Sequence, residues 1–228
     1  MEDQLAAERL QSGNDENIAP STEPYFVRLM AHVVSFIFHP LFIPAYVTAF
    51  LIYLHPYAFA GFDDRMKMMR LLSVLVSTTL LPAFSVFLLW RLDFISSIYL
   101  RTQRERIIPY AIALLFYFWV WYVFRNLSDS PLAIKDFLLG VFLAVCGCWL
   151  ANIVFKISMH GAAVGGMAMF MLLQSIKDPV MGGTYLAIAL VITGIVCTAR
   201  LILGGHSRPE VYLGLLIGAL AQVVSVVV

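Results

Sequence analysis

Seven long apolar stretches, separated by short polar ones, dominate this sequence of 228 residues. A helix needs about 20 mostly apolar residues to cross a bilayer, and within the hydrocarbon every backbone polar group must be satisfied inside the protein. The stretches therefore predict an all-α fold, a polytopic helical membrane bundle of six to seven transmembrane helices. The predicted spans cover residues 27–54, 69–90, 108–124, 132–155, 161–176, 183–203 and 210–228.

The composition supports this fold class and limits the function. Hydrophobic residues make up 61% of the chain and charged residues 13%, about half the charged share of an ordinary soluble domain. The net charge is +1 and no basic stripe is present, so we expect no nucleic-acid partner. Residues 1–24 are polar and mostly acidic, which predicts a disordered tail without a cleavable signal peptide, and residues 25–228 form a single transmembrane domain.

Two spans differ from a regular helix. The first contains His39-Pro40 and Pro44, and these prolines predict a kink or break because each removes a backbone donor and clashes with the preceding turn. The fifth span, 161–176, is short and rich in glycine, so we expect it to be buried among the other helices. Seven spans is the preferred count, and six if one segment is re-entrant.

Counting the spans sorts the polar connections by side. The N-terminal tail, the 91–107 loop, the 156–160 junction and the 204–209 junction all fall on one face of the membrane. The charged and histidine-containing segments of these connections therefore converge, and a shared site becomes possible.

The segment from Arg200 to Glu210 contains the polar residues that lipid disfavours most. Arg200 ends one span, His206 follows six residues later and Glu210 four beyond that. If the last helix begins near Ser207, the Glu210 carboxylate reaches back to one imidazole nitrogen, fixes the tautomer and makes the other nitrogen more nucleophilic. The alternative is an interfacial histidine beside snorkelling arginines.

A second histidine, His160, opens the fifth span. The glycines and alanines that begin with Gly161 allow close backbone approach, and a helix N-terminus offers free N–H groups to an anion. Ser158 could add a hydroxyl donor and Lys156 a positive charge. Small residues also pack helices together in lipid, and both interpretations can hold at once.

Three further arginines, Arg101, Arg104 and Arg106, lie on the same predicted face. They could be topology signals of a cytoplasmic loop or bidentate ligands of phosphate oxygens. Two histidines and a glutamate also suggest zinc, but the basic residues crowded on this face repel a cation and attract an anion. We therefore expect no metal, and an anion as the ligand.

The segment 199–210 resembles the third motif of the type 2 phosphatidic acid phosphatase superfamily, the membrane relatives of vanadium haloperoxidases. That motif reads Ser-Arg, five residues, His, three residues, Asp. Ala199-Arg200, His206 and Glu210 match its spacing, with alanine for the serine and glutamate for the aspartate.

Two other segments are similar to the remaining motifs of that superfamily. The second motif, Pro-Ser-Gly-His, is similar to Ile157-Ser158-Met159-His160, which keeps the serine and histidine. The first, Lys, six residues, Arg-Pro, is only loosely similar to Arg101, six residues, Ile108-Pro109, where Arg104 or Arg106 would replace the missing arginine. The resemblance covers roughly residues 91–228, but two predicted spans separate the first and second motifs, where many members have an extramembrane loop.

The resemblance implies a role for each residue. His206 would attack phosphorus and form a phosphohistidine, Glu210 would orient it, and His160 would protonate the leaving group. No cofactor is required. The groups that would hold the non-bridging oxygens are Arg200, Ser158, the Gly161 N–H and one or more of Arg101, Arg104 and Arg106.

Three functions are compatible with the sequence. The resemblance favours an integral-membrane lipid phosphatase acting on a polyprenyl pyrophosphate, phosphatidate, phosphatidylglycerophosphate or lipid A phosphate. The alternatives are an inactive relative that serves as a binding or assembly subunit, and a transporter with a charged site at mid-membrane. Motifs at helix ends argue against the transporter.

The basic residues also bear on sidedness. Nine lie on the motif face and six on the other, which by the positive-inside rule places the motif face in the cytoplasm. Five of the nine, Arg101, Arg104, Arg106, Lys156 and Arg200, would belong to the site. Without them the motif face has four basic residues against six on the other face, and the rule then gives the opposite orientation. The resemblance also favours an extracytoplasmic site. We therefore expect a bacterial inner-membrane protein with its site facing the periplasm. The nine are Arg9, Arg28, Arg91, Arg101, Arg104, Arg106, Lys156, Arg200 and Arg208; the six are Arg65, Lys67, Arg70, Arg125, Lys135 and Lys177.

Overall fold

The computed structural model describes residues 23–55, 57–95, 107–177 and 179–228, and the side chains of 179–182 are not among those described. All regular structure in these residues is helical, which confirms the all-α prediction. The described residues do not include Arg101, Arg104 or Arg106. Of the polar tail, they include only residues 23 and 24. Among the described residues six helical segments are long and apolar enough to cross a membrane: Asp64–Arg91 (α4, η2 and α5), Ile107–Asn126 (α6), Leu132–Val154 (α7), Met159–Lys177 (α8), Gly183–Ile202 (within α9, which covers Pro179–Ile202) and Arg208–Val227 (α10).

The first predicted span is divided into two shorter apolar parts. Helix α2 covers Tyr25–Ile37, and α3 (Ile43–Ala49) continues directly into a π-helical stretch, η1 (Phe50–Leu54). The predicted kink is thus a complete break at residues 38–42, where Pro40 cannot donate to a helical hydrogen bond. Pro44 lies in the first turn of α3, where proline is tolerated.

The break is held by hydroxyl groups of a neighbouring helix. The carbonyl oxygen of Leu41 accepts hydrogen bonds from Thr79 Oγ1 at 2.6 Å and Thr78 Oγ1 at 3.4 Å. These threonines belong to η2 (Val76–Leu80), the π-helical stretch between α4 (Asp64–Leu75) and α5 (Leu81–Arg91). Irregular backbone in a membrane protein is stable only where protein groups satisfy it, and here the two hydroxyls do so.

Helices α8 and α10 pack with their backbones in close approach. Glycines four residues apart face each other on the two helices, Gly161 and Gly165 on α8 and Gly214 and Gly218 on α10. A Cβ at Gly161 would lie 2.6 Å from the Val211 carbonyl oxygen, and one at Gly218 would overlap the Ala162 carbonyl. As predicted for the fifth span, α8 is buried among the other helices. In its apolar 18-residue stretch 44% of the residues are buried, against 17–39% in the corresponding stretches of the other five candidate spans.

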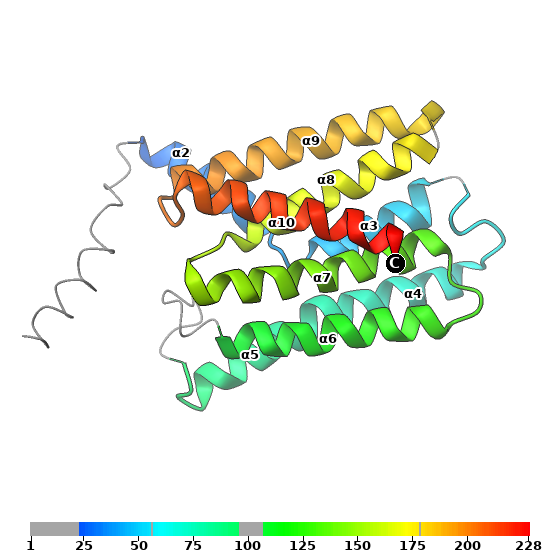
Figure 1. Ribbon diagram of the computed structural model, residues 1–228, viewed down its shortest axis with the longest axis horizontal. Coiled ribbons are helices and arrows are strands. Elements are labelled where there is room, and N and C mark those ends of the chain that lie inside the picture. Colours follow the sequence, from blue (N-terminus) through cyan, green and yellow to red (C-terminus); the bar gives the residue numbers. More distant parts are fainter. Residues whose placement is uncertain (1–22, 56, 96–106, 178) are drawn as a thin grey trace, which may run out of the picture.

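The ends of the helices gather as the span count predicts (Figure 1). The end of α5, the start of α6, the α7–α8 and α9–α10 connections and the start of α2 lie at one end of the bundle. The chain between η1 and α4, the α6–α7 connection and the C-terminus lie at the other. There Arg70 pairs with both carboxylate oxygens of Asp129 at 2.7 Å, joining α4 to the α6–α7 connection.

The glycine contact between α8 and α10 leads to a stability prediction. Gly218→Val places side-chain atoms on the α8 backbone, which cannot retreat as a flexible side chain would, so we expect a loss of about 3 kcal/mol, the upper end of overpacking costs. The matched control is Gly194→Val in α9, where an added Cβ meets nothing within 4 Å. Unfolding of the detergent-solubilised protein measures both, and equal stability of the two variants would contradict the packing described.

Candidate functional site

His206 and Glu210 form a side-chain hydrogen bond at the start of α10. His206 Nδ1 lies 2.8 Å from Glu210 Oε2, and the histidine side chain is 5% exposed. Helix α10 begins after its N-cap Ser207, so Glu210 occupies the third helical position, and Oε2 also accepts the Ser207 backbone N–H at 3.4 Å. A carboxylate only accepts hydrogen bonds, so Nδ1 carries the proton and, in the neutral ring, Nε2 holds the nucleophilic lone pair.

Arg200 lies in the last turn of α9, and its guanidinium group folds back over the turn that follows. Gly204 has a φ of 66°, in the left-handed region that favours glycine, and ends the helix. A Cβ at Gly205 would lie 3.0 Å from Arg200 Nη2, so the absence of a side chain there leaves room for the guanidinium. Arg200 Nη1 also donates to Ser35 Oγ of α2 at 3.5 Å.

His160, in the first turn of α8, makes its own contact with α2. Its Nε2 lies 3.0 Å from the backbone carbonyl oxygen of Ser35. Because a carbonyl only accepts, Nε2 carries the proton, and Nδ1 is the nitrogen that can exchange one with a ligand. The carbonyl of Ser35 belongs to the last turn of α2, where helical carbonyls lack partners and carry partial negative charge.

Ser158 and Gly161 are hydrogen-bonded to each other. The Gly161 N–H donates to Ser158 Oγ at 3.3 Å, and Ser158 is fully buried. The Ser158 N–H donates to the Glu210 carbonyl oxygen at 3.3 Å, which ties the start of α8 directly to the start of α10. To hold an anion, the Gly161 N–H would have to leave Ser158 Oγ, whereas Ser158 accepts this bond through its oxygen and keeps its hydroxyl proton to donate.

The structure thus brings most of the predicted residues to one end of the bundle. His160, Arg200 and Glu210 lie in the end turns of α8, α9 and α10. Ser158 and the half-buried Lys156 lie in the connection before α8, and His206 lies in the connection before α10. In the part of the chain that the structure describes, no three His, Cys, Asp or Glu side chains come close enough together to hold a metal ion.

Two residues that the sequence did not single out belong to the same cluster. Ser35 contacts both His160 and Arg200, and the His39 ring lies 5.4 Å from the His160 ring at an interplanar angle of 81°. Arg200 is near enough for its charge to act on both rings. The signal was a polar stripe, His32, Ser35 and His39, at helical spacing within an apolar segment.

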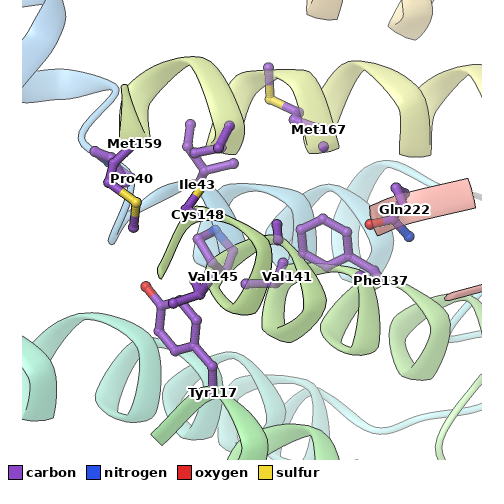
Figure 2. A pocket seen from close by; sticks show the side chains of 16 residues that line it. Pro40, Ile43, Tyr117, Phe137, Val141, Val145, Cys148, Met159, Met167 and Gln222 are labelled. Atoms are coloured by element: carbon purple, nitrogen blue, oxygen red, sulfur yellow. The ribbon is translucent and has the colours of Figure 1, made fainter. Parts of the chain in front are cut away.

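A small apolar cavity lies inside the bundle next to this cluster (Figure 2). It has a volume of about 40 Å³ and is lined mainly by apolar side chains of α3, α6, α7 and α8, with Gln222 of α10 at one end. Pro40 and Met159, the neighbours of His39 and His160, also line it. At this size it holds a few water molecules at most, so it is not a pocket for a lipid chain.

Comparison with known proteins adds no relative. The chain matches no protein-family model, no curated protein and no solved structure.

Proposed function

We propose that this protein is an integral-membrane lipid phosphatase that hydrolyses a phosphomonoester or pyrophosphate through a phosphohistidine intermediate. The observation that carries the proposal is the His206–Glu210 contact of 2.8 Å, with the Arg200 guanidinium beside Gly205 and His160 at the same end of the bundle. A nucleophile oriented by a carboxylate and surrounded by cationic donors is the arrangement that phosphoryl transfer requires.

The proposed reaction has two steps. His206 Nε2 attacks phosphorus while Glu210 stabilises the imidazolium through Nδ1–H, and the P–O bond to the lipid breaks. For the leaving oxygen to take a proton from His160 Nδ1, the ring must be doubly protonated while the anionic substrate is bound, since its Nε2–H stays on the Ser35 carbonyl. His160 then takes a proton from water, which attacks the phosphohistidine and releases inorganic phosphate and free His206.

Glutamate in place of the superfamily's aspartate is compatible with this chemistry. Its extra methylene raises the question of whether the imidazole would be misplaced. In this chain Glu210 starts from the third position of α10 and its Oε2 contacts both His206 and the Ser207 N–H. The longer side chain therefore reaches the ring without leaving its helix-capping position.

A second candidate function is an inactive relative that serves as a binding or assembly subunit. The hydrogen bond between Gly161 N–H and Ser158 Oγ favours it, because one of the groups expected to hold a phosphate oxygen, the Gly161 N–H, is already satisfied within the protein. Arg101, Arg104 and Arg106 of the loosely similar first motif lie outside the described residues.

Hydrolysis by variant proteins tests the first function. We expect phosphate release from at least one member of a panel of polyprenyl pyrophosphate, phosphatidate, phosphatidylglycerophosphate and lipid A phosphate. His206→Ala should reduce release about a thousandfold or more, as when the nucleophile of a catalytic unit is lost, and His160→Ala about a hundredfold or more, as for a general acid.

The control is His55→Asn at the opposite end of the bundle. His55 Nδ1 accepts the Ala58 N–H at 3.1 Å, and an asparagine oxygen can replace it, so this variant should retain activity. Folded protein that releases no phosphate from any lipid, or releases it equally in the His206 and His160 variants, would contradict the phosphatase proposal. A partner that co-purifies with both variants would then favour the subunit.

We further propose that the protein resides in a bacterial inner membrane with the site facing the periplasm and membrane lipids as its surroundings. The basic residues outside the proposed site support this orientation, six on the opposite face against four on the site face. Helix α10 runs from the site to the opposite end of the bundle, so the C-terminus would be cytoplasmic (Figure 1).

A C-terminal reporter fusion tests this orientation. Green fluorescent protein fused after Val228 should fluoresce, because it folds in the cytoplasm, and alkaline phosphatase at the same position should be inactive. The reverse pair of results would place the site in the cytoplasm.

A further inference from the structure

His39 lies within the candidate site but has no part in the proposed reaction. It is half-buried in the break between α2 and α3, beside the His160 ring, and within range of the charge of Arg200. An imidazole in such apolar surroundings loses hydration, a cost that a hydrogen-bonding role would offset.

The backbone determines which nitrogen of His39 carries its proton. Nδ1 accepts the Leu41 N–H at 3.4 Å, so the neutral ring has its proton on Nε2. In His160 the two nitrogens have the reverse roles: the Ser35 carbonyl accepts its Nε2–H, and Nδ1 is the nitrogen that exchanges a proton. The two adjacent rings thus offer different groups to a ligand, a fixed N–H donor from His39 and a proton-exchanging nitrogen from His160.

The segment that carries His39 is held in place before any ligand binds. The hydroxyls of Thr78 and Thr79 fix the Leu41 carbonyl, and Leu41 in turn donates to His39. Pro40 and Pro44 restrict the backbone on either side. A donor held in this way needs little reorganisation to stabilise a negative charge.

We propose that His39 is a further anion-binding residue of this site, donating its Nε2–H to a phosphate oxygen beside the guanidinium group of Arg200. The inference deepens the proposed phosphatase and rests on it for the identity of the ligand as a phosphate group. It adds a ligand from the N-terminal segment, outside residues 91–228, to those from the three motif segments. The same oxyanion chemistry serves a lipid phosphate and free inorganic phosphate.

Binding of inorganic phosphate tests His39 without requiring catalysis. The full chain, labelled with ¹⁵N-histidine in nanodiscs, contains five histidines, each assignable by single substitution. We expect phosphate to move the His39 Nε2 signal. His39→Leu should weaken phosphate binding about tenfold or more, the effect of losing a hydrogen bond to a charged group, and His39→Gln should restore much of it through its amide N–H.

The matched control is His55→Gln. His55 also accepts a backbone N–H at Nδ1, but at the opposite end of the bundle, so its substitution should leave phosphate affinity unchanged. If His39→Leu does not fold, the shift of the His39 signal in the unaltered protein and the affinity of His39→Gln still decide the matter.

The outcomes separate this inference from the proposed function. Phosphate that shifts the His160 or His206 signals but not His39, or binds equally to a folded His39→Leu variant, overturns the role of His39 while the phosphatase stands. Binding that depends on His39 without hydrolysis of any lipid phosphate supports the anion site and contradicts the enzyme. Absence of any phosphate-induced shift overturns the role of His39, and a parallel hydrolysis assay with the same lipids then decides the enzyme separately.

Discussion

The close approach of α8 and α10 is the contact on which the candidate site depends. Glycines on both helices let backbone meet backbone, a packing mode that suits a membrane because lipid supplies no hydrophobic force to hold helices together. At the end of the bundle that carries the site, a hydrogen bond from the Ser158 N–H to the Glu210 carbonyl also joins the starts of these two helices. The separation of the two histidine-bearing segments is therefore set by main-chain atoms rather than by flexible side chains.

The N-terminal segment completes the cluster from the other side. The end of α2 presents a carbonyl to His160 and a hydroxyl to Arg200, both from Ser35. The negative end of a helix suits a group of cationic side chains. The break that follows α2 is thus a functional feature of the bundle as well as a consequence of its prolines.

Much of this arrangement could be predicted from the sequence, for physical reasons. Long apolar runs in a membrane must be helical. Because successive spans cross in opposite directions, residues 156–160 and 204–209 lie on the same side however the helices pack. The contact between His206 and Glu210 follows from a four-residue spacing once a helix begins after Ser207. These features depend on local geometry alone.

The features that the sequence did not provide depend on tertiary contacts. His39 reaches His160 because the chain beyond it is tied to Thr78 and Thr79, 37 and 38 residues from Leu41. The glycine spacing indicated close packing but not which helix α8 would meet. The hydrogen bond of Ser158 to Gly161 depends on the backbone geometry at the start of α8, which residue types do not specify.

The central claim is that His206, oriented by Glu210, accepts a phosphoryl group. The most direct measurement is to incubate the protein with a lipid labelled in its phosphate, quench rapidly in alkali, which preserves phosphohistidine, and locate the label by mass spectrometry. We expect a phosphoryl group on His206 that is lost in acid and that is absent or greatly reduced in Glu210→Ala. Rapid hydrolysis with no label on His206, or label on another residue, would contradict it.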